Sequence, residues 1–134
     1  MALDSKLKIN EDFTNNLTDI DIYFARGEHG DVEALDGPGG IVAHSGLPPR
    51  GYLHLDADEQ WSFDGINGID LRYVILHETG HLLGLRHTRV SSAIMNPYYR
   101  DLKNGLILSP HDVHSIQKLY SDVYLTSEQK LLKL

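Results

Sequence analysis

The stretch that decides the fold spans residues 77–87 and reads His77-Glu78-Thr79-Gly80-His81-Leu82-Leu83-Gly84-Leu85-Arg86-His87. Histidines four residues apart lie on one face of a helix, so the imidazoles of His77 and His81 can reach the same ion. Glu78 follows the first of them, where its carboxylate can contact a water on that ion. The stretch therefore predicts a helix that carries two metal ligands and a general base.

The residues after this helix complete the predicted site. Gly84 lets the chain leave the helix with a positive φ, and His87 can return as a third ligand. Three protein ligands leave a fourth position open, which is typical of a catalytic rather than a structural zinc. The alternative is a helix that carries two histidines by chance. Gly84, His87 and a methionine in a following turn, Met95, together favour the zinc site.

The composition indicates one domain without disulfides. The chain has 134 residues, no cysteine and a net charge of −7, and we expect a single domain over residues 1–134. No apolar run is long enough to span a membrane, and residues 1–18 are too polar for a signal peptide. The negative charge argues against a nucleic-acid partner. It indicates either an acidic surface or carboxylates that bind calcium.

The spacing of apolar residues predicts a mixed set of strands and helices. Alternating patterns predict strands over 19–25, 41–44 and 52–56, with a further short strand over 6–10. Asp70 is the predicted N-cap of the helix that carries the zinc motif. Ser109, followed by a proline and an acid, predicts a second helix that ends near residue 120, and a last short helix is expected over 128–134.

A second group of metal-ligating side chains lies on or beside the predicted strands. It consists of His29, Asp31, His44 and His54. Three imidazoles and one carboxylate make a closed tetrahedral set, which suits a structural zinc. The alternative is scattered surface histidines or hydrogen-bonded histidines without a metal, and the spacing alone favours that alternative.

A glycine-rich loop, residues 36–41, is interleaved with these histidines. Its carboxylate and backbone carbonyls, with Asp56 and Glu59 nearby in sequence, can supply an oxygen cage for calcium. An ordinary Pro-Gly turn with solvated acids explains the same residues equally well.

The order of these short motifs resembles that of the matrixins, the matrix metalloproteinase branch of the metzincin proteases. The resemblance runs through the segments 29–31, 36–40, 43–44, 54–61, 77–87, 93–99 and 108–120. It implies an α+β catalytic domain over residues 19–120, with a small mixed twisted sheet, an active-site helix and a C-terminal helix. Residues 1–18 would be an atypical N-terminal segment and 121–134 a C-terminal extension.

The resemblance also implies roles for individual residues. The catalytic zinc would lie on His77, His81 and His87, with Glu78 as the base, and the structural zinc on His29, Asp31, His44 and His54. Calcium would lie between Asp36, Gly37, Gly39, Ile41, Asp56 and Glu59. The substrate would contact Val42 and Ala43 on an edge strand and Tyr73, Val74, Pro97 and Tyr99 around a pocket, while Asp112 would anchor the turn that contains Met95.

The chain differs from the matrixin pattern at both ends. Residues 1–18 are too few for the first strand and long helix that matrixins place there. One face of the sheet would therefore be exposed, or be covered by 121–134 or by a second copy of the chain. The second calcium site of the family is not expected, because the loop 45–53 is short. His111 and His114 have no assigned role and are expected at the surface.

These features predict a zinc-dependent endopeptidase that hydrolyses peptide bonds in extended polypeptides. A zinc-activated water would attack the scissile carbonyl while Glu78 takes its proton. An apolar residue would follow the scissile bond, in a pocket that Tyr73 makes shallow. The resemblance implies an extracellular protein and, as further partners, proteinaceous metalloprotease inhibitors. The alternative is a non-catalytic zinc- and calcium-binding module that binds peptides without cleaving them.

Overall fold

The computed structural model describes residues 18–100 and 105–120. In this part of the chain, three strands form a sheet in the order β1-β3-β2: β1 (Asp21–Ala25), β3 (Tyr52–Asp56) and β2 (Ala43–Ser45). β1 runs parallel to the central strand β3, and β2 runs antiparallel to it. The predicted strands at 19–25, 41–44 and 52–56 are confirmed with shifts at their ends, and the sheet is mixed as expected. The strand predicted over 6–10 and the helix predicted over 128–134 lie outside the described residues.

The sequence did not predict a second, smaller sheet. β4 (Trp61–Ser62) and β5 (Ile69–Asp70) pair in parallel within the stretch expected to be a plain connector. Each strand has two residues, which is too short for an alternating pattern to show in the sequence. β5 leads directly into α1 and thereby fixes where the active-site helix begins.

Helix α1 (Leu71–Leu82) begins and ends as the sequence predicts. The Asp70 carboxylate accepts a hydrogen bond from the Arg72 backbone N–H at 3.0 Å, which is the N-cap interaction. At the other end Gly84 has φ of 97°. Its N–H donates to the His81 carbonyl, and the Leu85 N–H donates to the Gly80 carbonyl. This Schellman pattern turns the chain out of the helix.

The core lies between β3 and α1. Leu53 and Leu55 point from β3 to this side and are almost completely buried, together with Val74, Leu82 and Ile94. His54 lies between the two leucines in sequence and therefore points to the opposite face of the sheet. The central strand thus packs the core with one face and supplies a potential metal ligand from the other.

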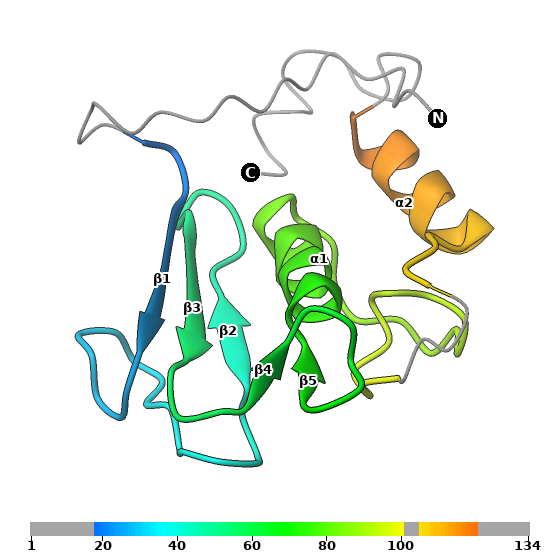
Figure 1. Ribbon diagram of the computed structural model, residues 1–134. Coiled ribbons are helices and arrows are strands. Elements are labelled where there is room, and N and C mark those ends of the chain that lie inside the picture. The colour runs from blue at the N-terminus through cyan, green and yellow to red at the C-terminus, as the bar shows by residue number, and fades with distance from the viewer. Residues whose placement is uncertain (1–17, 101–104, 121–134) are drawn as a thin grey trace.

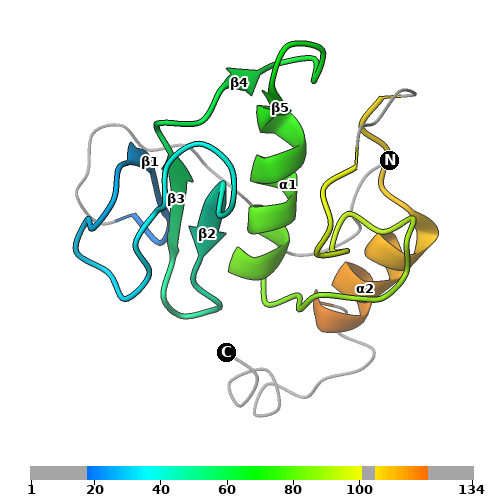
Figure 2. The ribbon, with the colours of Figure 1, turned by 90° about the horizontal axis from the view of Figure 1, so that it is seen from below.

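Helix α2 (Pro110–Tyr120) packs beyond α1. Figures 1 and 2 show α1 between the three-stranded sheet and α2 in both views. The Tyr120 hydroxyl donates to the Leu83 carbonyl at 2.9 Å, which ties the end of α2 to the end of α1. Among the described residues no helix is long and apolar enough to cross a membrane.

Candidate metal centres

The three histidines of the zinc motif converge at the end of α1. The Nε2 atoms of His77 and His81 each lie 3.1 Å from Nε2 of His87. The His77 Nδ1 lies 2.7 Å from the Ile94 carbonyl oxygen, and the His81 Nδ1 lies 2.8 Å from that of Leu85. Because a carbonyl only accepts, both Nδ1 atoms must carry the proton, which leaves the Nε2 lone pairs free to bind a metal.

This donor set fits zinc. Donors about 2.0–2.1 Å from a tetrahedral zinc lie about 3.3 Å from one another, close to the observed Nε2 separations. The three rings are on α1 and the loop after it, as the motif predicts, and they form one of the two clusters of metal-ligating groups in the described part of the chain. Three imidazole ligands leave room for a fourth, exchangeable ligand.

Glu78 lies next to these ligands and is shielded from solvent. Its residue is only 7% exposed. Its Oε2 accepts a hydrogen bond of 2.5 Å from the hydroxyl of Ser45, which comes from β2. The sequence did not identify Ser45, because nothing in the spacing of the zinc motif indicates which strand residue faces the carboxylate.

A turn that contains Met95 lies beneath the histidines and is held by α2. The backbone N–H of Ile94 donates to both carboxylate oxygens of Asp112 at 3.0 Å. The backbone carbonyl of Ile94 accepts a hydrogen bond from Nδ1 of His77. Asp112 also accepts from the backbone N–H and the hydroxyl of Ser109. A chain of hydrogen bonds therefore runs from the start of α2 through the turn to a predicted zinc ligand.

We expect Gly80→Ala to destabilise the fold and weaken metal binding at this centre. A Cβ atom on Gly80 would overlap the Sδ of Met95, which is 4% exposed and has little room to move. Overpacking of this kind costs about 1–3 kcal/mol. Urea unfolding measures the cost. In a Met95→Ala background the same substitution should cost clearly less, and an equal cost in both backgrounds would contradict the proposed clash.

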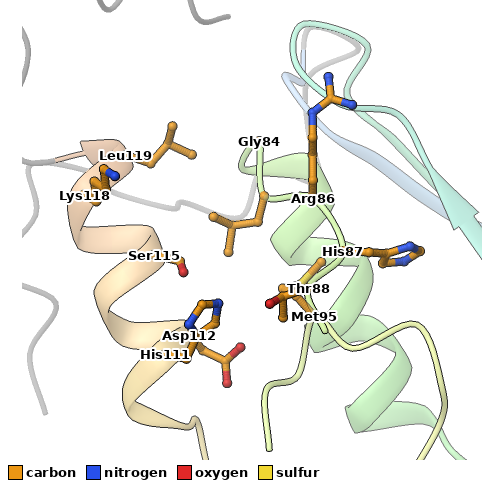
Figure 3. Close-up of a pocket in the computed structure, with 11 residues that line it drawn as sticks. Gly84, Arg86, His87, Thr88, Met95, His111, Asp112, Ser115, Lys118 and Leu119 are labelled. Carbon is orange, nitrogen blue, oxygen red and sulfur yellow. The ribbon is translucent and has the colours of Figure 1, made fainter. Parts of the chain in front are cut away.

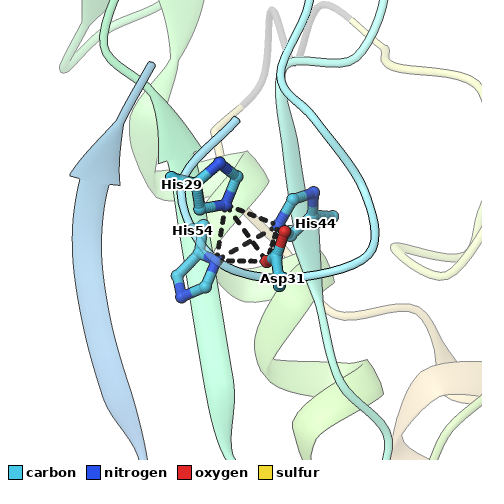
Figure 4. Close-up of side chains that lie close together, drawn as sticks. All are labelled: His29, Asp31, His44 and His54. Carbon is cyan, nitrogen blue, oxygen red and sulfur yellow. Dashed lines mark hydrogen bonds and ion pairs between the residues drawn. The ribbon is translucent and has the colours of Figure 1, made fainter. Parts of the chain in front are cut away.

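The second cluster brings together the four side chains expected to bind the structural zinc. Its donor atoms are Nε2 of His29, Oδ2 of Asp31, Nε2 of His44 and Nδ1 of His54, and Figure 4 shows them facing one another. All six separations lie between 2.7 and 3.2 Å. The four side chains are therefore not scattered over the surface. A closed set of three imidazoles and a carboxylate fits a structural zinc.

The surroundings of the second cluster shift the pKa values of His54 and Asp31. Burial lowers the pKa of His54, and this outweighs the opposing effect of its hydrogen bond with Asp31. Burial tends to raise the pKa of Asp31, but hydrogen bonds from His54 and His44 outweigh it and keep that pKa below its usual value. The His29 Nδ1 donates to the Gly27 carbonyl at 2.8 Å, which leaves its Nε2 free for a metal.

We expect the metal-free protein to lose stability as the pH falls through about 6.5. The pKa of His54 is lower in the folded state than its ordinary value of 6.5. As the pH falls, the unfolded chain therefore binds a proton at His54 before the folded protein does. The contribution of His54 to the free energy of unfolding is present above pH 6.5 and is lost below it. Urea midpoints between pH 8 and pH 5.5, measured with a chelator present, should fall. His54→Gln should weaken this dependence, and part of it should remain because burial also lowers the pKa of His87. The exposed His114→Gln should leave it unchanged.

The loop expected to bind calcium folds around the predicted carboxylates. The backbone N–H of Gly37 donates to Asp56, that of Gly39 to Glu59 and that of Ile41 to Asp36, at 2.6 to 3.0 Å. In residues 18–100 and 105–120, only the two histidine clusters bring three or more metal-ligating side chains within 4.8 Å of one another. Calcium binding here would therefore depend on backbone carbonyls as well as carboxylates.

The residues expected to contact substrate lie in three places: the edge of the sheet, the core, and the exposed segment that contains Pro97 and Tyr99. β2, with Ala43, lies at an edge of the described sheet. Tyr73 and Val74 are 2% and 4% exposed and belong to the core. The Tyr73 ring packs edge-on against Tyr99 at 5.0 Å, and the Tyr99 hydroxyl accepts from the Asp70 N–H. Tyr99 is thereby fixed against the start of α1, next to the predicted pocket.

A cavity of about 400 Å³ separates the loop after α1 from α2. Figure 3 shows its lining, which includes His87 and Met95 on one side and His111, Ser115 and Leu119 on the other. His111 is exposed, as expected from the sequence, but it borders this cavity. The sequence gives no signal for the cavity, because only the packing of α2 against the loop creates it.

A family model and several known metalloproteinases are similar in sequence to this chain. The family model described as Matrixin matches residues 2–121. The chain is 46% identical over 108 residues to karilysin from Tannerella forsythia and 48% identical over 105 residues to stromelysin-3 from Mus musculus. It is 42% identical over 120 residues to metalloendoproteinase 2-MMP from Arabidopsis thaliana. These matches cover 76%, 76% and 84% of the chain but only 23%, 21% and 31% of the relatives.

Proposed function

Because the chain belongs to the matrixin family, we propose that it is a zinc-dependent endopeptidase that hydrolyses peptide bonds in extended polypeptides. The observation that carries this proposal is the first metal centre. The Nε2 atoms of His77 and His81 each lie 3.1 Å from Nε2 of His87, beside the buried carboxylate of Glu78. This combination supplies an open metal site and a general base in one place.

Each residue of the centre has a chemical task in this proposal. Zinc, when bound, supplies a Lewis acid that polarises the scissile carbonyl and acidifies water. The carbonyls of Ile94 and Leu85 hold the imidazoles of His77 and His81 in the tautomer that presents Nε2. Glu78 takes the proton from the attacking water and passes it to the leaving amine.

The substrate would add to the sheet as an extended strand. β2 is an edge strand of the described sheet, and its Ala43, with Val42 just before it, can exchange backbone hydrogen bonds with a peptide. An apolar side chain after the scissile bond would contact Val74, Tyr73, Pro97 and Tyr99. The bulk of Tyr73, packed against Tyr99, supports a shallow pocket and a preference for medium-sized aliphatic residues.

The remaining metals would be structural. We place a second zinc on the cluster of His29, Asp31, His44 and His54, which its closed geometry supports. Calcium would be held by the loop with Asp36, Gly37, Gly39 and Ile41, together with Asp56 and Glu59. The closeness of these carboxylates to the loop supports this placement.

Two kinds of protein partner besides the substrate also belong to the proposal. Proteinaceous metalloprotease inhibitors would bind along the same edge strand as the substrate. Self-association would use Ile22 and Phe24 of β1, which lie on the same side of the sheet as Leu53 and Leu55 of β3 and are each 50% exposed. Light scattering across a range of protein concentrations tests the self-association.

The function is tested with a quenched fluorescent peptide that contains a central Gly-Leu bond. We expect cleavage that a zinc chelator stops and that added zinc restores. Peptides with Asp or Lys in place of the leucine should be cleaved much more slowly, which tests the apolar preference. No cleavage of this peptide or of an unfolded polypeptide by protein that contains zinc would contradict the proposal and favour a peptide-binding module.

A further inference from the structure

One hydrogen bond joins the proposed base to a strand rather than to its own helix. The Ser45 Oγ lies 2.5 Å from Oε2 of Glu78, and 3.2 Å from the backbone carbonyl oxygen of the same residue. Glu78 is 7% exposed, so water has little access to it. Among the described residues, Ser45 is the only hydrogen-bond donor to this carboxylate.

The register of β2 determines where this serine points. His44 pairs with His54 and Ser45 pairs with Leu53 of β3. His44 contributes its Nε2 to the second metal cluster on one face of the sheet. Successive residues of a strand point to opposite faces, so Ser45 points to the face that packs on α1. Its hydroxyl is thus held in place by the backbone pairing and by the ligand next to it.

A base that accepts a proton from water must present one carboxylate oxygen in a fixed direction. A hydroxyl that donates to Oε2 restricts rotation of the carboxylate and leaves Oε1 without a protein partner among the described residues. Hydrogen bonds to a charged, poorly hydrated group are among the stronger ones. We propose that Ser45 is a positioning residue for the reaction, which holds the Glu78 carboxylate so that Oε1 faces the attacking water.

This inference rests on the proposed endopeptidase function and adds a link between its parts. The dipeptide His44-Ser45 contributes to both centres, with one side chain in each. The same strand also includes the edge on which the substrate would lie. Strand β2 would therefore align the Glu78 carboxylate and also position the substrate. A misplaced β2 would disturb both the base and the substrate.

The competing explanation is that the serine only ties the strand to the helix. In that case its loss would lower stability without a specific effect on turnover. Threonine and valine at this position provide a matched pair, because they have the same shape and both suit a strand, but only threonine keeps the hydroxyl. Ser45→Ala provides a third variant in case the branched residues do not fit. Ser91→Ala, at an exposed site, is the control.

The test compares steady-state cleavage of the Gly-Leu peptide and the visible spectrum of the cobalt-loaded proteins. Ser45→Val and Ser45→Ala should lower kcat about tenfold with KM unchanged, as expected for an interaction that acts on the chemical step. Ser45→Thr should remain within about twofold of the original protein. The cobalt bands respond to hydrogen bonding around the metal, so they should shift in the valine and alanine variants and not in the threonine variant.

The outcomes separate the inference from the function on which it rests. If the unaltered protein cleaves the peptide and Ser45→Val matches Ser45→Thr in kcat and in cobalt spectrum, the positioning role is overturned and the endopeptidase proposal stands. Equal losses in the valine and threonine variants, accompanied by lower unfolding midpoints, would also overturn it in favour of a structural tie. If the zinc-loaded unaltered protein cleaves nothing, both proposals fail.

Discussion

Glu78→Ala is expected to lower kcat by about 10²–10⁴-fold and to leave zinc bound. The three Nε2 ligands do not depend on the Glu78 side chain, because the carbonyls of Ile94 and Leu85 orient two of the rings. Removal of the carboxylate deprives the attacking water of a proton acceptor in a buried position. Turnover of the fluorescent peptide and the zinc content per chain, measured on the same preparation, check the two halves of this expectation.

The control for this substitution is Glu28→Ala, at an exposed position of the loop after β1, which should keep full activity. Retained activity in Glu78→Ala would remove this residue from the role of base. Loss of zinc together with activity would show that the carboxylate is needed to form the site, and would also contradict the assignment.

Asp112→Ala is expected to destabilise the protein by about 3–5 kcal/mol, because several buried donors lose a charged acceptor, and this is at the upper end of single-substitution effects. The Asp112 carboxylate is buried and accepts from the N–H groups of Ile94 and Ser109 and from the Ser109 hydroxyl. Alanine would leave these buried donors without an acceptor. The turn between α2 and His77 would then lose its anchor, so weaker zinc binding should accompany the loss of stability.

Thermal and urea unfolding of the zinc-loaded protein measure the stability term, and competition with a zinc chelator measures the affinity. His111→Ala changes the neighbouring, exposed residue of the same helix and is the matched control. Asp112→Asn keeps one acceptor oxygen, so its losses of stability and zinc affinity should be smaller than those of Asp112→Ala and larger than those of His111→Ala. A stability change below about 1 kcal/mol in Asp112→Ala would show that the network contributes little.

The sequence predicted α1 and the convergence of His77, His81 and His87 closely, because their signals are local. The N-cap at Asp70, the ligand spacing of four residues and the glycine that ends the helix all act within a few turns of one another. Such signals do not depend on the rest of the fold. The second cluster is different, since its ligands come from separate segments. Spacing alone pointed away from it, and only the resemblance to matrixins identified it.

Other features could not be predicted because they depend on which surfaces meet. β4 and β5 are too short to produce a pattern. The contact between Ser45 and Glu78 joins residues 33 positions apart. To predict this contact, one must know the register of β2 and the distance between β2 and α1. The cavity between α2 and the loop after α1 likewise depends on packing between segments that are separate in sequence.

The second cluster has a consequence for a chain without cysteine. Its ligands His29 and His54 lie 25 positions apart and meet at one point, so a bound ion closes a loop much as a disulfide does. Such a cross-link removes conformations from the unfolded chain, but it is governed by metal supply rather than by redox potential. A reducing environment would leave it closed, whereas a chelator would open it and expose the sheet to proteolysis.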